Sequence, residues 1–327
     1  MIKLTQSLKG RDFISLSDFT GDELMQFLDT AAELKDKLKR GEPHQILKGK
    51  TLAEIFEWPS TRTRTSFEVG IQQLGGHGIY YSKQAYWSKG GEAIKDSAQV
   101  LSRYVHGIAW RSFSHEDILE MAKYATVPVI NANSDFEHPC QVLADFMTTR
   151  ENKGKLEGIK TVIMWTYADF PAPIGIVNST MFAGGKLGMD VVLSYPEDYG
   201  PEKKVFDIAE KEAKKSGGSI TVVEDYKEAL KDADVIHIKT WAKPEDYRRG
   251  FDEYKPPHVL EPEKYNHWKL TQDLVDLGKK DVIVQHALPV VRKVQATEAV
   301  LDGPNSVIYD EAENRLHTQK AVMALTM

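Results

Sequence analysis

The sequence of 327 residues lacks the features that mark secreted, membrane and nucleic-acid-binding proteins. Its single cysteine, Cys140, excludes a disulfide framework and favours a reducing compartment. No apolar run approaches the roughly 20 residues of a membrane span, and the first residues carry no signal-peptide core. The net charge is −6 without any basic run, which argues against nucleic acid as a partner. We therefore expect a cytoplasmic protein that binds neither membranes nor nucleic acid.

The composition is that of an ordinary globular protein, with 28% charged and 41% apolar residues, and the length suits two domains. Apolar strand patterns alternate with helical patterns, which predicts parallel sheets covered on both sides. In the first half we expect a helix that opens at Pro139 and carries the chain between the domains, strands at 51–56, 77–81, 106–110 and 127–131, and helices at 20–40, 60–74, 92–105 and after Ser114. The expected helix caps are a capping box of Thr20 with Glu23, Ser60, and Ser114 with Asp117.

The second half repeats this alternation without a detectable sequence repeat. Segment 151–154 is the best linker candidate, and the final helix, 310–325, is apolar on one face. The expected strands are 160–166, 189–194, 219–223, 234–239, 281–286 and 306–309, and the expected helices are 175–187, 202–216, 225–232 and 268–279. The predicted fold class is α/β, with two doubly wound parallel-sheet domains at 1–150 and 151–309, joined by helices, and with 310–327 returning to the first.

One stretch, Ser60-Thr61-Arg62-Thr63-Arg64, follows a buried-strand pattern and a turn and opens a helix. Two arginines in a first helical turn oppose the helix dipole, at a cost of roughly 0.3–1 kcal/mol each. An anion bound there would remove that cost, because backbone N–H groups, hydroxyls and guanidinium groups converge on it. The alternative is an exposed arginine pair bridged to Glu57 or Glu68. The strand–turn–helix context favours the anion site.

Three further stretches follow predicted strands, where ligands collect in open α/β sheets. Arg111 could be a second anion clamp or simply structural. His138 and Gln141 flank Pro139 at a helix start and should point the same way, unless they are only a cap and a solvated amide. In His286-Ala287-Leu288-Pro289, the proline should hold Leu288 extended and leave two carbonyls for a ligand NH₂; a strand that merely ends at a proline is the alternative.

Together these motifs resemble the aspartate/ornithine carbamoyltransferase family. The resemblance covers nearly the whole chain, and the motifs that carry it stand in the family's order: Ser-Thr-Arg-Thr-Arg at 60–64, His-Pro-Cys-Gln at 138–141, His-x-Leu-Pro at 286–289, Asp96 to Tyr104 and Asp310 to Arg315. It implies a two-domain enzyme that moves a carbamoyl group from carbamoyl phosphate to an amine without metal or cofactor. The resemblance also implies a role in amino-acid biosynthesis, including the biosynthesis of arginine. It further implies a homotrimer with active sites between the subunits.

The resemblance assigns roles by position. The phosphate would be held by Ser60, Thr61, Arg62 and Thr63, with Arg111 assisting. The carbamoyl oxygen would be polarised by Arg111, His138 and Thr63, the catalytic residues. The carbamoyl nitrogen would be held by Gln141 and by the backbone at Ala287 and Leu288, and Arg315 would close the site. The carbamoyl phosphate-binding domain would thus be 1–150, and the acceptor-binding domain would be 151–309.

The acceptor half resembles the N-acetylornithine and N-succinylornithine branch, which predicts an N-acylated ornithine as acceptor and a knotted loop near Trp165. Lys239 stands where ornithine enzymes have an aspartate, and it would repel a free α-ammonium. Trp87 would reach a neighbouring subunit's site, and Arg292 could bind the acceptor. The branch's residues are absent at Ala168, Ala287 and Val291. The alternative acceptors are ornithine, a diamine or another amino acid.

Two functions of other classes agree less well with the sequence. A non-catalytic anion-binding regulatory homologue would fit the changes at Ala287 and Val291, but it would gain nothing from His138 and Gln141. A nucleotide-binding dehydrogenase fits poorly. The glycines at 184, 185 and 188 end a helical pattern, whereas the dinucleotide fingerprint needs them in a strand-to-helix turn.

Overall fold

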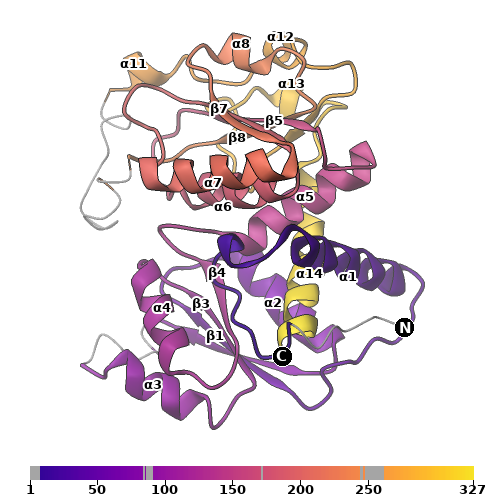
Figure 1. Ribbon diagram of the computed structural model, residues 1–327, viewed down its shortest axis with the longest axis vertical. Helices are drawn as coiled ribbons and strands as arrows, with labels where there is room; N and C mark the ends of the chain where they lie inside the picture. Colours follow the sequence, from indigo (N-terminus) through magenta and orange to yellow (C-terminus); the bar gives the residue numbers. More distant parts are fainter. Residues whose placement is uncertain (1–7, 84, 86–90, 171, 244–245, 247–260) are drawn as a thin grey trace. The chain divides into compact units, whose positions relative to one another are not determined.

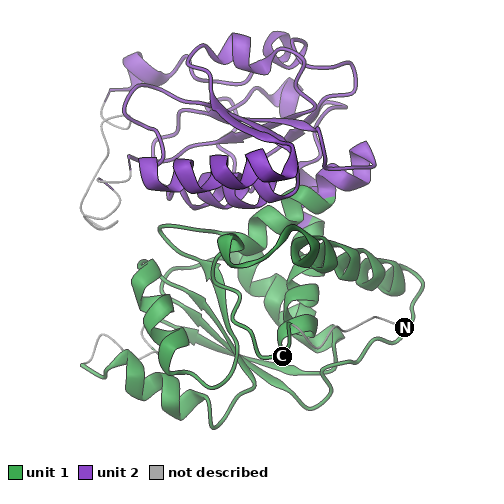
Figure 2. Ribbon diagram, viewed as in Figure 1, with its two compact units in different colours: residues 1–147, 313–327 green, residues 148–312 purple. Residues whose placement is uncertain are grey.

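The computed structural model describes residues 8–83, 85, 91–170, 172–243, 246 and 261–327. The chain forms two compact units, shown separately coloured in Figure 2. Unit 1 comprises Met1–Met147 and Glu313–Met327, and unit 2 comprises Thr148–Ala312. The predicted two-domain α/β architecture with two parallel sheets is confirmed. The predicted knotted loop includes Pro171, which lies outside the described residues, and it stays a prediction.

Unit 1 contains a four-stranded sheet in the order β2-β1-β3-β4, with every neighbouring pair parallel (Figure 1). Its strands are β1 (Thr51–Phe56), β2 (His77–Ser82), β3 (Gly107–Arg111) and β4 (Val129–Asn133). Its helices are α1 (Gly21–Lys39), α2 (Thr61–Gln73), α3 (Ile94–Leu101) and α4 (His115–Tyr124), preceded by the short η1 (Leu16–Asp18). Helices α5 (Pro139–Lys153) and α14 (Ile308–Thr326) each contribute residues to both units.

The helix starts follow their sequence signals in two of three cases. Thr20 and Glu23 form the predicted capping box of α1, and the Ser114 hydroxyl accepts the Asp117 N–H at the start of α4. Ser60 occupies the cap position of α2, but its side chain accepts no cap hydrogen bond. The expected Ser60 cap is therefore absent, and the start of α2 is left to other acceptors.

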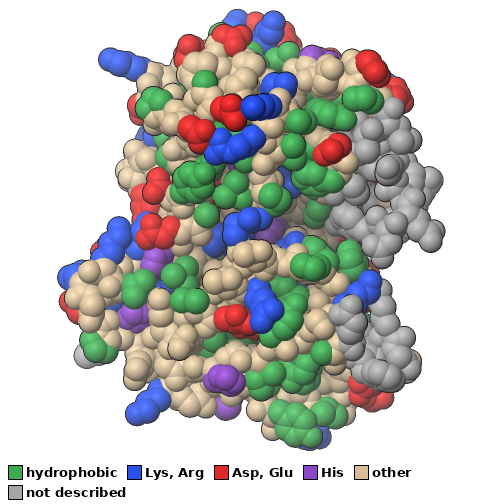
Figure 3. All heavy atoms as spheres, turned by 180° about the vertical axis from the view of Figure 1, so that it is seen from behind, with side chains coloured by type: hydrophobic (Ala, Val, Ile, Leu, Met, Phe, Trp, Pro, Cys, Tyr) green, Lys and Arg blue, Asp and Glu red, His purple; other side chains and the backbone are tan. Residues whose placement is uncertain are grey.

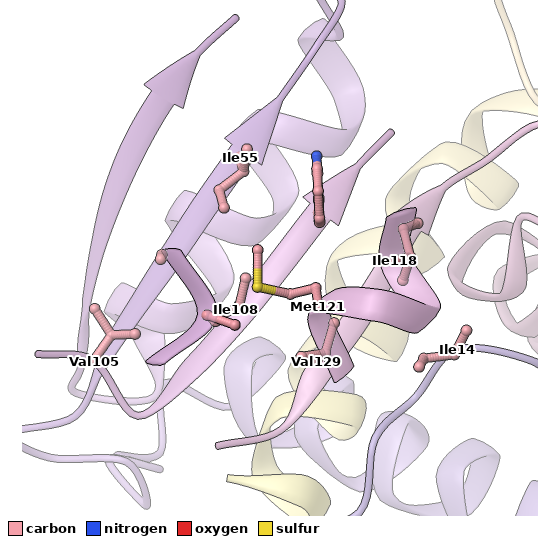
Figure 4. Packing of buried hydrophobic residues seen from close by; sticks show 10 residues of the cluster. Ile14, Ile55, Val105, Ile108, Ile118, Met121 and Val129 are labelled. Atoms are coloured by element: carbon pink, nitrogen blue, oxygen red, sulfur yellow. The ribbon is translucent and has the colours of Figure 1, made fainter. Parts of the chain in front are cut away.

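The core of unit 1 includes a cluster of aliphatic side chains between its sheet and its helices. In Figure 4 the labelled members point toward one another from β1, β3, β4, α4, the chain before η1 and the segment between α3 and β3: they are Ile14, Ile55, Val105, Ile108, Ile118, Met121 and Val129. Burying each such side chain contributes roughly 1.5–3 kcal/mol. This packing fixes the carboxyl ends of β1 and β3, where the candidate anion residues stand.

Unit 2 contains a five-stranded parallel sheet in the order β7-β6-β5-β8-β9. Its strands are β5 (Lys160–Trp165), β6 (Asp190–Ser194), β7 (Ser219–Val222), β8 (Val235–Lys239) and β9 (Ile283–Gln285). Its described helices are α6 (Gly175–Lys186), α7 (Lys203–Ser216), α8 (Tyr226–Leu230), α11 (Pro262–Tyr265), α12 (Gln272–Val275) and α13 (Glu298–Leu301).

Three predicted elements were wrong. The strand at 306–309 is only an isolated bridge from Ser306 to Val284, because the chain turns directly into α14. The helix at 268–279 shrinks to α12, because the Leu270 backbone pairs with the 295–297 segment instead. Segment 151–154 is no linker, since α5 stays helical to Lys153 and Gly154 ends it at φ +74°.

Among the described residues no helix is both long enough and apolar enough to cross a membrane. On the face shown in Figure 3, acidic and basic side chains are interspersed instead of gathering into a large patch of one sign.

Candidate active site

Each sheet has one topological switch point, where the strand order reverses direction. In unit 1 it lies between β1 and β3, and in unit 2 it lies between β5 and β8. Ligands of open α/β sheets bind beyond the carboxyl ends of the strands at such points. The residues after β1 are the Glu57–Arg64 stretch, and β3 ends at Arg111. The structure therefore brings the predicted anion residues to the switch point of unit 1.

The two arginines at the start of α2 have different surroundings. Arg64 is paired, because its Nε donates to Glu68 at 2.8 Å and its Cζ lies 3.6 Å from the centroid of the Tyr80 ring. The alternative of a bridge to Glu68 is therefore correct for Arg64. Arg62 is half-buried, and Thr63, beside it, is buried. The first turn of α2 contains no acidic residue, so the positive end of its helix dipole is suited to an anion.

Arg315 of α14 connects two of the predicted motifs inside unit 1. Its Nη1 donates to Gln141 Oε1 at 2.5 Å, and its Nη2 donates to Thr63 Oγ1 at 3.1 Å. All three side chains are 2% exposed. Residues 63, 141 and 315, which are widely separated in the sequence, are thus held in one hydrogen-bonded group at the start of α2 and α5.

Gln141 has a second partner that the sequence analysis missed. Its Nε2 donates to Asp145 Oδ1 at 2.7 Å, one helical turn further along α5. Because Asp145 holds the amide nitrogen, the amide oxygen faces Arg315, and a carbonyl oxygen has two lone pairs and can accept a further donor. The four-residue spacing of Gln141 and Asp145 was the signal that could have revealed this pair.

His138 lies at the start of α5, and the helix begins as expected after it. The His138 carbonyl accepts from Gln141 N at 3.1 Å and from Val142 N at 3.3 Å, and the imidazole is buried. The neighbouring thiol is unreactive by contrast, since burial raises the pKa of Cys140 to about 12. His138 is therefore the group in this motif that can act on a carbonyl oxygen.

Arg111 is held by an aromatic stack at the carboxyl end of β3. Its Cζ lies 4.3 Å from the centroid of the Trp58 ring, and that ring stacks on Phe113 with centroids 4.4 Å apart. The Glu57 N–H donates to the Arg111 carbonyl at 3.0 Å. Arg111, at the end of β3, thus contacts the turn that contains Ser60, although sequence reasoning did not single out Trp58.

In unit 2, Lys239 ends β8 at the switch point and is half-buried. The Lys239 carbonyl accepts from the N–H of Thr166, the residue that follows the adjacent strand β5, at 2.9 Å. The charge of Lys239 adds to the effect of burial on His237, whose pKa falls to about 3. Trp241 is fully buried and donates to the Tyr199 carbonyl at 2.7 Å, so it belongs to the core of unit 2.

The His286–Pro289 segment departs from the prediction at Leu288. Leu288 lies in the left-handed region at φ +49° and precedes a cis proline, so the expected extended conformation is wrong. Its N–H donates to His286 Nδ1 at 2.8 Å, which favours this tight turn. Among the described residues, no backbone N–H donates to the carbonyl of Ala287 or Leu288. Both carbonyls therefore retain their capacity to accept from a ligand.

The other two predicted acceptor residues have different outcomes. Arg292 forms a bidentate pair with Asp302 at 2.7 and 2.8 Å, which raises its pKa and commits its guanidinium to a partner within unit 2. Trp87 lies outside the described residues. Ala287, Leu288, Lys239 and Arg292 all belong to unit 2, whereas the predicted phosphate residues belong to unit 1.

Comparisons with known proteins agree with this arrangement. Residues 11–151 match the aspartate/ornithine carbamoyltransferase carbamoyl-P binding domain, and residues 158–326 match the Asp/Orn binding domain of the same family. The chain is 48% identical to the ornithine carbamoyltransferase of Thermococcus kodakarensis over 98% of both proteins.

Solved structures extend the similarity to both branches considered above. The ornithine carbamoyltransferase of Pyrococcus furiosus superimposes with a TM-score of 0.89 at 46% identity, covering 98% of each chain. A mutant N-acetyl-L-ornithine transcarbamylase complexed with carbamyl phosphate and N-succinyl-L-norvaline reaches 0.87 at 35% identity, covering 97% of this chain and 100% of the other. The chain therefore belongs to the aspartate/ornithine carbamoyltransferase family, and it is a carbamoyltransferase.

Proposed function

We propose that this enzyme transfers the carbamoyl group of carbamoyl phosphate to the side-chain amine of ornithine and releases phosphate. The observation that carries the choice of acceptor is that relatives 47–48% identical over nearly the whole chain are named ornithine carbamoyltransferases. The N-acetyl-L-ornithine enzyme is only 35% identical. Ornithine, given above as an alternative, is thus better supported than an N-acylated ornithine.

The phosphate of the donor would bind at the switch point of unit 1. Backbone N–H groups at the start of α2, the hydroxyls of Ser60, Thr61 and Thr63, and the Arg62 guanidinium would surround its oxygens. Arg111 would approach from the adjacent strand. A doubly charged phosphate matches a helix N-terminus and planar guanidinium groups, since both present N–H donors in fixed directions.

The carbamoyl carbon would be activated by donors directed at its oxygen. As the amine attacks, negative charge grows on this oxygen, and Arg111, His138 and Thr63 would stabilise it. Gln141, fixed by Asp145 and Arg315, would accept from the carbamoyl nitrogen and orient the group. That Ala287 and Leu288 supply further acceptors to this nitrogen stays a prediction.

The attacking amine must lose its proton first. With an ordinary pKa near 10.4, deprotonation at pH 7 costs about 4–5 kcal/mol. The departing phosphate becomes more basic as its bond to carbon breaks, so it can take the proton that the attacking nitrogen releases. Holding both substrates in one geometry lowers the barrier further, because the entropy of bringing them together is spent on binding. No metal or redox group takes part in these steps.

Lys239 does not decide between the acceptors by its charge alone. A lysine at the β5/β8 switch point would attract the α-carboxylate, which ornithine and its N-acyl derivatives share. It would repel only the α-ammonium, which ornithine alone carries. The contribution of Lys239 to acceptor choice therefore depends on which of these two groups lies nearer to it, and turnover measurements separate the two cases.

The test is a colorimetric assay of ureido products with carbamoyl phosphate and a panel of amines. The panel holds ornithine, N-acetylornithine, N-succinylornithine, putrescine, lysine and aspartate. We expect the highest kcat/KM on ornithine. Fastest turnover on either N-acyl compound would refute ornithine as the acceptor and would support an N-acylated ornithine, as the sequence predicted. Phosphate release without any ureido product would refute the proposed transfer to these amines.

The family resemblance also predicts a homotrimer in which Trp87 reaches a neighbouring site. Both stay predictions. Sedimentation of the purified protein at equilibrium would measure the first directly, and a Trp87→Ala variant mixed with an Arg62→Ala variant would test the second through the activity of mixed trimers.

A further inference from the structure

Trp58 stands in the turn between β1 and α2, and two other side chains pack against its indole. Arg111 Cζ lies over the ring, 4.3 Å from its centroid. The Phe113 ring is stacked with the indole, with the centroids 4.4 Å apart and 29° between the two planes. A guanidinium at this distance from an indole is attracted by the ring's negative face. The three side chains form one stack that joins β1 to β3.

The backbone on either side of this stack is fixed by Glu57. Its N–H donates to the Arg111 carbonyl at 3.0 Å, and its Oε2 accepts from Phe113 N at 2.9 Å. Glu57 is buried. Glu57, the residue before Trp58, is therefore hydrogen-bonded to Arg111 and to Phe113, the two residues whose side chains stack with the indole.

The kind of contact matters for the chemistry of Arg111. A carboxylate that pairs with a guanidinium takes up N–H donors and offsets its positive charge, as Glu68 does for Arg64. A ring face engages the π system and needs none of the five N–H groups that a guanidinium presents at its edge. The indole can therefore fix the plane of Arg111 while its edge is directed at an oxyanion.

We propose that Trp58 is the positioning residue of Arg111: its indole sets the plane of the guanidinium at the β1/β3 switch point, so that the N–H edge meets the oxyanion of carbamoyl phosphate. This inference rests on the proposed function, in which Arg111 binds the donor. It assigns to the turn a role beyond that of Ser60, Thr61 and Arg62. In this role Trp58 acts through Arg111 and is not a catalytic residue.

The experiment is a double-mutant cycle of Trp58→Leu and Arg111→Met, read as KM for carbamoyl phosphate and kcat of ureido formation. We expect Trp58→Leu to raise this KM about tenfold, the loss of one partly desolvated cation–π contact. The same substitution should change nothing further in the Arg111→Met background, because Trp58 acts through Arg111. Trp58→Phe keeps a ring face and should stay within about threefold of the wild type.

The controls separate positioning from general damage to the fold. Tyr104 is an aromatic residue of the same unit with 73% of its surface exposed, and Tyr104→Leu should leave both constants unchanged. Thermal unfolding of every variant reports stability, and Trp58→Met enters the cycle if the leucine variant does not fold. If the wild type is active and Trp58→Leu has the same effect in the wild type and in Arg111→Met, the inference is wrong and the proposed function is unaffected. A wild type without any ureido product would overturn the proposed function and the inference with it.

Discussion

Replacing Arg315 with methionine is expected to lower kcat/KM for carbamoyl phosphate by about two to three orders of magnitude. Arg315 donates to Gln141 Oε1 and to Thr63 Oγ1, and all three side chains are buried. Removing the guanidinium takes away one hydrogen-bond partner from Gln141 and one from Thr63, which are proposed to act on the nitrogen and the oxygen of the carbamoyl group. Their side chains would then be less well oriented toward the carbamoyl group.

The same helix offers a matched control in Lys320. Lys320 is a second fully buried base on α14, donating to Gln73 Oε1 at 3.0 Å, away from the α2 and α5 starts. Lys320→Met should leave kcat/KM within about twofold of the wild type, since a surface or core change outside the site does not alter transition-state binding. If both variants lost activity equally, the loss would report damage to α14, and the assigned role of Arg315 would be wrong.

Replacing Glu54 with methionine is expected to stabilise the protein by about 3 kcal/mol at pH 7. Glu54 lies on β1, in register with Tyr80 and Ala109, and its side chain is fully buried. Within the described residues neither carboxyl oxygen has a hydrogen-bond partner. Burial, with the nearby Glu68 charge, raises the pKa of Glu54 to about 8, against the opposing effect of Arg64.

The pH dependence of the stability follows from the raised pKa of Glu54. Below pH 4.5, Glu54 is protonated in both the folded and the unfolded chain, so its ionisation does not change the free energy of unfolding. Between pH 4.5 and about 8, the unfolded chain loses the proton while the folded one keeps it, so stability falls by about 1.4 kcal/mol per pH unit. The advantage of Glu54→Met should therefore grow as the pH rises from 5 to 8, and chemical denaturation at several pH values measures it.

Glu68→Gln is the control for this measurement. Glu68 also faces Arg64, but this pair is about 40% exposed on both sides, so its loss should change stability by only about 0.5 kcal/mol. An advantage of Glu54→Met that is the same at pH 5 and pH 8 would show that its carboxyl does not titrate as stated. A variant less stable than the wild type at pH 8 would show that Glu54 has a stabilising partner.

The place of the proposed donor residues in the fold could be predicted from the sequence because they lie in short local patterns. A strand, a turn and a helix start place Ser60 to Arg62 together, and Arg111 ends the neighbouring strand β3. The order of β1 and β3 then needs only the rules of parallel sheets. Local signals also located the capping box at Thr20 and Glu23, which the structure confirms.

Other features depend on distant contacts and left no local signal. The stack on Arg111 requires knowing that Trp58 and Phe113 meet across two strands. Glu54 sits within an apolar run that was interpreted only as a buried strand, because a single acidic residue does not disturb such a pattern. The strand expected at 306–309 failed because apolar β-branched residues also begin α14. The acceptor was predicted from the resemblance of the second half to the N-acylornithine branch and from Lys239, and whole-chain similarity favours ornithine instead.

The most direct test of the central claim is a calorimetric titration of inorganic phosphate into the wild type and two arginine variants. The claim is that the β1/β3 switch point of unit 1 binds the phosphate group through Arg62. Arg64, two residues along, is already paired with Glu68 and the Tyr80 ring, and is its matched control. We predict that Arg62→Ala abolishes phosphate binding and that Arg64→Ala leaves it unchanged. Unaltered binding by Arg62→Ala, or its loss in Arg64→Ala alone, would contradict the account.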